Sequence, residues 1–164
     1  MVHPLAFSPI LRDTLPEAHA LLASANLTLH PAVTRVVLCG SRGPAGGARP
    51  DSDVDLTLIV DTGGLPIGPE LARLLQEVLD TALENWRGPV EADLAAVFDT
   101  QGCGLACFAV RDYRQGACPT GGVDCFGIYK VQRGFDGFVP PIGVRVALVH
   151  PCLTIWQAEA GGDA

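Results

Sequence analysis

Lysine is almost absent from this sequence of 164 residues, since Lys130 is the only lysine among 11 basic residues. The 18 acidic residues give a net charge of −7. The chain therefore lacks the excess of positive charge with which proteins bind nucleic acids or anionic membranes over a broad surface. This balance argues against a general nucleic-acid or membrane-surface binder, although a small basic site remains compatible with it.

The sequence also lacks a secretory signal and a membrane span. Its first residues do not have the basic-then-apolar layout of a signal peptide, and no apolar run reaches about 18 residues. None of the six cysteines forms a CxxC pair. We therefore expect a cytoplasmic protein with reduced thiols. A zinc site would have to use Cys118, Cys125, His150 and Cys152, whose spacing fits no standard pattern, so buried free thiols are the better interpretation.

The composition that is present predicts one packed domain. Apolar residues make up 48% of the chain and charged residues 18%, which is typical of a globular core. The length suits a single domain and would be crowded for two. We expect a core over 1–100, an extension over 101–157 packed on the same domain, and a disordered tail over 158–164.

Hydrophobic periodicity predicts an α/β (α+β) fold with a mixed β-sheet flanked by helices. A capping box from Thr14 to Glu17 predicts a helix over 15–26. A second, strongly amphipathic helix is predicted over 69–86. Expected strands cover 34–39, 53–60 and 89–98.

Beyond residue 100 the pattern indicates a β-rich extension. A short helix is expected over 105–114, followed by strands over 123–131 and 144–150. Residues 153–156 extend the last strand in this interpretation. Tyr129 and Lys130 lie on one of these strands, where a solvated edge is the default interpretation and contact with a nucleotide or acceptor is the alternative.

The most informative motif joins the first two predicted strands. The first ends at Gly40-Ser41, and the second begins with Asp53 and Asp55. Because side chains alternate along a strand, both carboxylates are expected on one face. Two like charges at about 4 Å repel by roughly 4 kcal/mol at an effective dielectric near 20. Mg²⁺ would relieve this repulsion, since it binds carboxylate oxygens, water and phosphates.

Two other motifs are excluded. An EF-hand loop starting at Asp51 would need Gly and Glu at its sixth and twelfth positions, where this chain has Leu56 and Thr62. The glycine-rich segment 40–46 has neither the Gly-Lys-Ser/Thr of a Walker loop nor the GxGxxG spacing. Its significance comes from its place between a strand and a paired-aspartate strand.

In these residues the chain resembles the minimal nucleotidyltransferases of the DNA polymerase β-like superfamily. The shared pattern is an apolar strand, Gly40-Ser41, Asp53-x-Asp55 on the next strand, a helix, and Asp93 on a later strand. The resemblance covers roughly residues 30–100 and implies a nucleotidyltransferase-like sheet. Glu91 shares the expected face of Asp93 and is the alternative third carboxylate.

The resemblance implies a Mg²⁺-dependent enzyme that moves a nucleoside monophosphate from a nucleoside triphosphate, most simply ATP, to an acceptor hydroxyl. Asp53, Asp55 and Asp93 would be the catalytic and metal-binding residues for two Mg²⁺ ions. Asp93 would also take up or orient the proton of the attacking hydroxyl. The phosphates would contact Gly40, Ser41 and Arg42. A homodimer that completes the cleft is a further implication.

The chain also departs from the family pattern. Many small members carry Arg-Gly where this chain has Pro44 and Ala45, and the loop is about one residue longer; Arg49 is a candidate substitute. The acceptor is left open between a protein side chain, a small alcohol and a nucleic-acid end, which the net charge disfavours. The rival hypothesis is a non-catalytic antitoxin of a toxin–antitoxin pair that binds a protein partner.

Overall fold

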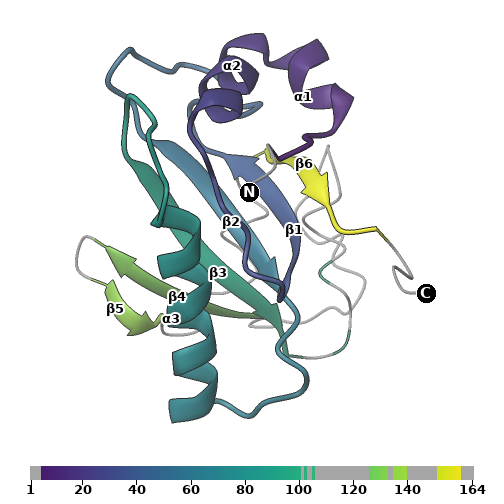
Figure 1. Ribbon diagram of the computed structural model, residues 1–164, viewed down its shortest axis with the longest axis vertical. Coiled ribbons are helices and arrows are strands. Elements are labelled where there is room, and N and C mark those ends of the chain that lie inside the picture. The colour runs from purple at the N-terminus through teal and green to yellow at the C-terminus, as the bar shows by residue number, and fades with distance from the viewer. Residues whose placement is uncertain are drawn as a thin grey trace.

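The centre of the structure is a mixed β-sheet with helices packed on one side (Figure 1). The computed structural model describes residues 5–100, 102, 105, 126–132, 135–139 and 151–159. Within these residues the strand order is β5-β4-β3-β2-β1-β6. The helices are α1 (Pro9–Thr14), α2 (Pro16–Ser24) and α3 (Pro69–Leu83), and the strands are β1 (Val33–Cys39), β2 (Val54–Val60), β3 (Ala92–Asp99), β4 (Phe126–Gln132), β5 (Phe135–Phe138) and β6 (Leu153–Gln157).

The sheet is mixed because β2 and β3 run parallel to each other. Strands β2 and β3 are parallel, while each other neighbouring pair among the described strands is antiparallel. Helix α3 connects β2 to β3, as a parallel pair requires a long crossover. The prediction of an α+β fold with a mixed sheet is confirmed at this level.

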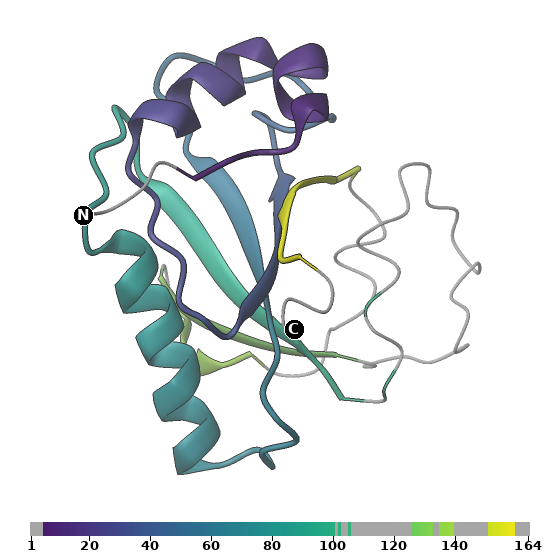
Figure 2. The ribbon, with the colours of Figure 1, turned by 45° about the vertical axis from the view of Figure 1, so that its right-hand side comes forward.

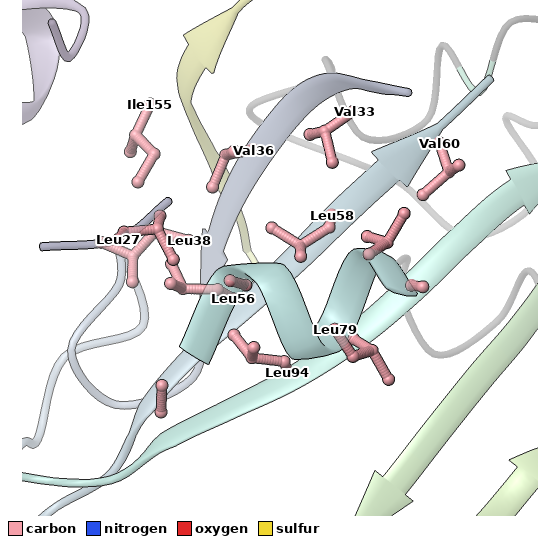
Figure 3. Close-up of a cluster of buried hydrophobic side chains, with 14 of the residues drawn as sticks. Leu27, Val33, Val36, Leu38, Leu56, Leu58, Val60, Leu79, Leu94 and Ile155 are labelled. Carbon is pink, nitrogen blue, oxygen red and sulfur yellow. The ribbon is translucent and has the colours of Figure 1, made fainter. Parts of the chain in front are cut away.

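The main core lies between the sheet and the helices. Even-numbered residues of β1 and β2, such as Val36, Leu38 and Leu56, are buried against α3, which contributes Leu75 and Leu79 (Figure 3). Figure 2 shows α1 and α2 above the sheet and α3 beside it. Each fully buried leucine contributes roughly 1.5–3 kcal/mol, so the apolar stripe of α3 fixes which face of β2 and β3 points inward.

The odd-numbered residues of the central strands form the opposite face. Val37, Ile59 and Val97 are buried there in a second, smaller cluster that also includes Leu105. The guanidinium of Arg35, itself buried, donates a hydrogen bond from Nη2 to the carbonyl of Leu105 at 2.9 Å. This face also carries the acidic residues of the predicted site.

The predicted capping box at Thr14 is wrong. Thr14 is the last residue of α1, and its hydroxyl donates to the carbonyl of Ile10 within that helix. Helix α2 begins instead at Pro16. Leu15 is its N-cap residue, and no side-chain hydrogen bond caps this end of the helix. A proline at the start of each helix supplies the fixed φ that a first turn needs. Helix α2 lies within the predicted helix 15–26, whereas α1 was not predicted.

Helix α3 ends earlier than predicted. It stops at Leu83 rather than at residue 86, and the amide of Trp86 donates to the carbonyl of Leu83 in a turn. The indole Nε1 of Trp86 then donates to the carbonyl of Val90 at 3.1 Å. Trp86 therefore closes the connection into β3 rather than extending the amphipathic helix.

The described parts of the predicted extension belong to the same sheet as the first 100 residues. Strand β4 overlaps the predicted strand 123–131, starting three residues later and ending one residue later, and pairs with β3. Strand β6 contains 153–156 and pairs with β1. The predicted strand 144–150 and nearly all of the predicted helix 105–114 lie outside the described residues. No helix of the described residues is long and apolar enough to cross a membrane.

Candidate functional site

Two of the predicted carboxylates lie side by side on neighbouring strands. Strands β2 and β3 run parallel in a register that pairs Asp55 with Asp93. Adjacent strands lie about 4.8 Å apart, and both residues occupy the face away from the helices. Asp53 precedes the first residue of β2, so the strand begins one residue later than predicted.

The Asp55 and Asp93 carboxyl groups interact directly. Partial burial raises the pKa of Asp55 to about 6, and the charge of Asp93 and a hydrogen bond shared with it act in the same direction. The charge of Asp53 raises this pKa further, whereas Lys130 lowers it. A shared hydrogen bond requires a proton, so the pair retains one at a pH where an isolated aspartate would be ionised.

Lys130 supplies a positive charge to this pair. Its Nζ lies 2.8 Å from Asp93 Oδ1, and the two side chains are 23% and 16% exposed. The angles of the contact are not those of a hydrogen bond, and Asp93 Oδ1 has no hydrogen-bond partner among the described residues. The contact is therefore an ion pair. The buried Asp93 Oδ1 can still accept a hydrogen bond or bind a cation.

The default interpretation of Lys130 from the sequence was a solvated edge, with contact to a nucleotide or acceptor as the alternative, and its pairing with Asp93 was not predicted. On β4 the register pairs Tyr129 with Ala96, which sets Lys130 beside β3 on the face of Asp93. Its side chain reaches Asp93 diagonally, as long side chains do across neighbouring strands. Its status as the single lysine was the available signal, but the pairing of β4 with β3 could not be read from the sequence.

Gly40 brings the backbone against the Asp55 carboxylate. It follows β1 with φ of +69°, and a Cβ at this position would overlap the Asp55 side chain. The amide of Gly43 donates to the Gly40 carbonyl at 3.0 Å and closes the bend. Only glycine allows both this φ and this close approach without strain.

Arg42 braces the glycine-rich loop. Its Nε donates to the carbonyl of Ser52 at 2.8 Å, and its Nη2 donates to the carbonyls of Arg49 and Pro50 at 3.1 and 3.2 Å. These bonds hold the end of the loop next to Asp53. At least two of the nitrogens of Arg42 are therefore engaged with the loop itself.

Two cavities lie near the loop. One, of about 330 Å³, is lined by Ser41, Arg42 and glycines of the loop together with the start of α2. The other, of about 710 Å³, is lined by Asp53, Glu91 and Trp86 among others. Neither lining includes Asp55 or Asp93, so the predicted phosphate-binding and metal-binding residues border different spaces.

The predicted carboxylates are only partly brought together. Asp93 is the one that hydrogen-bonds Asp55, whereas Glu91 precedes β3 and is exposed beside Asp53. In the residues that the structure describes, no group of three or more histidine, cysteine, aspartate or glutamate side chains is arranged to hold a metal ion. The donor chemistry of Asp55 and Asp93 still fits a hard cation, given the buried Asp93 Oδ1 and the carboxyl repulsion.

Comparisons of the chain with models of protein families, with curated proteins and with solved structures found no match. The interpretation of the site therefore depends on its own geometry and on the sequence pattern.

Gly40→Ala should destabilise the protein more than Gly46→Ala. Both glycines have positive φ, but a Cβ at Gly46 would meet no atom within 4 Å. The control should therefore cost only the conformational term of about 1–2 kcal/mol, whereas Gly40→Ala must also displace the Asp55 carboxylate. Urea unfolding measures the difference, and equal losses would contradict the close approach.

Stability should fall with rising pH because of Asp55. Its folded pKa of about 6 lies above its ordinary value of 3.8, so the native state binds more protons than the unfolded state between these values. The stabilising contribution is complete below about pH 4 and is lost as the pH rises through about 6. Asp55→Asn should show a shallower decline of the unfolding free energy over this window. Parallel curves for the two proteins would contradict the shift.

Proposed function

We propose that the chain is a Mg²⁺-dependent nucleotidyltransferase of the DNA polymerase β-like type. The observation that carries this proposal is the register pairing of Asp55 with Asp93 beside the Gly40 bend. The order of strand, Gly-Ser, loop, aspartate strand, helix and aspartate strand supports it. The parallel β2–α3–β3 unit supports it further, because it sets two carboxylates from distant segments next to each other.

Asp53, Asp55 and Asp93 would hold the cations in this proposal. Mg²⁺ held there would supply positive charge that favours the ionised carboxylates and offsets the charge of the triphosphate. The backbone N–H groups around Gly40 and Ser41 would donate to phosphate oxygens. Asp93 Oδ1, which has no hydrogen-bond partner among the described residues, would be the acceptor that orients an incoming hydroxyl.

The reaction transfers a nucleoside monophosphate group. The acceptor hydroxyl oxygen forms a bond to the α-phosphorus of the triphosphate while the bond from that phosphorus to the bridging oxygen breaks. Pyrophosphate leaves with the electron pair of the broken bond, and the proton of the hydroxyl passes to Asp93. ATP is the expected nucleotide donor. The acceptor is a molecule that carries a hydroxyl group.

A non-catalytic binding module is the second candidate. The ion pair between Lys130 and Asp93 balances one carboxylate without a metal. In this case the chain would be a nucleotidyltransferase-fold antitoxin that binds a protein partner and leaves the carboxylate pair unused.

Calorimetric titration with Mg²⁺ and ATP separates the two candidates. The wild-type chain should bind, and Asp55→Asn should lose affinity by at least about tenfold, or about 1.4 kcal/mol. Asp61→Asn is the matched control. Asp61 is exposed and directly follows the last residue of β2, at the opposite end of the strand from Asp55. Its Oδ1 accepts a hydrogen bond from the amide of Gly63, and the side-chain oxygen of asparagine can accept the same bond. A labelled-ATP transfer assay in cell extract then tests for the acceptor.

Each outcome of the titration bears on the proposal. Binding that is lost in Asp55→Asn and kept in Asp61→Asn supports the nucleotide site. An equal effect of both substitutions would move the site away from Asp55. No binding by the wild-type chain favours the binding module.

Lys130→Gln should increase the affinity for Mg²⁺ alone. The substitution removes the ammonium that lies 2.8 Å from Asp93 Oδ1 and competes with a cation for that oxygen. Lys130→Arg keeps the charge and serves as the control. Titration with Mg²⁺ in the absence of nucleotide measures the change. Unchanged or weaker binding in Lys130→Gln would show that the ion pair does not compete with metal.

A further inference from the structure

Two cysteines meet across β1 and β6, next to the carboxylate pair. The antiparallel register pairs Leu38 with Leu153, so the next step along each chain sets Cys39 opposite Cys152. Directly opposite residues of antiparallel strands have Cα atoms about 4.5–5.5 Å apart. This spacing falls within the range of about 4.4–6.8 Å that a disulfide requires.

The two side chains also face each other. Both belong to the cluster on the sheet face away from the helices, and their thiols share a hydrogen bond. Both residues carry thiols, Cys152 being buried and Cys39 partly exposed. Cys39 is therefore the more accessible of the two residues, and the second sulfur is already in place.

We propose that Cys39 and Cys152 are a redox pair that forms a reversible intrachain disulfide when the protein meets hydrogen peroxide. One sulfur, as thiolate, attacks a peroxide oxygen and becomes a sulfenic acid, releasing hydroxide. The other sulfur attacks the sulfenic sulfur, the S–S bond forms, and the sulfenic oxygen leaves as water. Overall, two thiols and one peroxide give one disulfide and two waters, and the peroxide takes up two electrons.

The disulfide would fix an edge of the sheet. Strand β6 is the outermost strand beside β1 and is held to the sheet by that pairing. A bond from Cys39 to Cys152 closes a long loop, which restricts the unfolded chain and stabilises the folded one. Because Gly40 follows Cys39 directly, the same bond fixes the chain at the start of the bend.

The test uses the full chain with its other four cysteines replaced by serine. The protein is first reduced and then treated with dilute hydrogen peroxide. Its mass should fall by that of two hydrogen atoms, and neither thiol should then react with an alkylating reagent. The melting temperature should rise by several degrees, and dithiothreitol should reverse both changes. Cys152→Ser in the same background is the control and should gain oxygen or dimerise instead.

Peptide mapping of the oxidised wild-type chain gives an independent readout that does not depend on the serine variant folding. A cross-linked peptide that joins Cys39 to Cys152 supports the proposal. It is overturned if both thiols stay alkylatable after peroxide, or if each is oxidised without joining the other. Catalysis plays no part in this measurement, so the outcome is separate from the nucleotidyltransferase proposal.

Discussion

Two carboxyl groups in direct contact cannot both be ionised without a compensating charge. This constraint governs the electrostatics of the candidate site. At about 4 Å the repulsion is roughly 4 kcal/mol at an effective dielectric near 20. In the structure, a shared hydrogen bond and the Lys130 ammonium relieve it. Burial and the charge of Asp93 raise the pKa of Asp55, and the backbone at Gly40 packs against the same carboxylate.

The contact originates in the packing of α3 against the sheet. The helix buries its apolar stripe on the even-numbered residues of β2 and β3, which directs Asp55 and Asp93 to the other face. A shift of either strand by one residue would turn these carboxylates into the core and expose the leucines. The hydrophobic pattern therefore sets the electrostatics of the site, since the register that buries Leu56 and Leu94 is the one that pairs the aspartates.

Local pattern predicted the central strands, α3 and the candidate residues Asp55 and Asp93, because each depends on alternation or on a 3.6-residue period. One feature that it missed depends on a contact between distant segments. Lys130 reaches Asp93 through the pairing of β4 with β3, which no local pattern encodes. Arg42 was predicted to contact phosphates, but carbonyls of its own loop accept hydrogen bonds from it. Thr14 matched a capping motif that a proline-started helix displaced.

Three species can reduce the repulsion between the Asp55 and Asp93 carboxylates: a proton, the Lys130 ammonium and a divalent cation. Near neutral pH, above the Asp55 pKa of about 6, the proton is mostly lost. The ammonium lies at Asp93 and balances one charge, while the charge of Asp53 still acts on Asp55. One monovalent cation therefore neutralises only part of the negative charge of these carboxylates. A divalent ion would neutralise more of it. This charge balance is the physical basis of the proposed cation-dependent site.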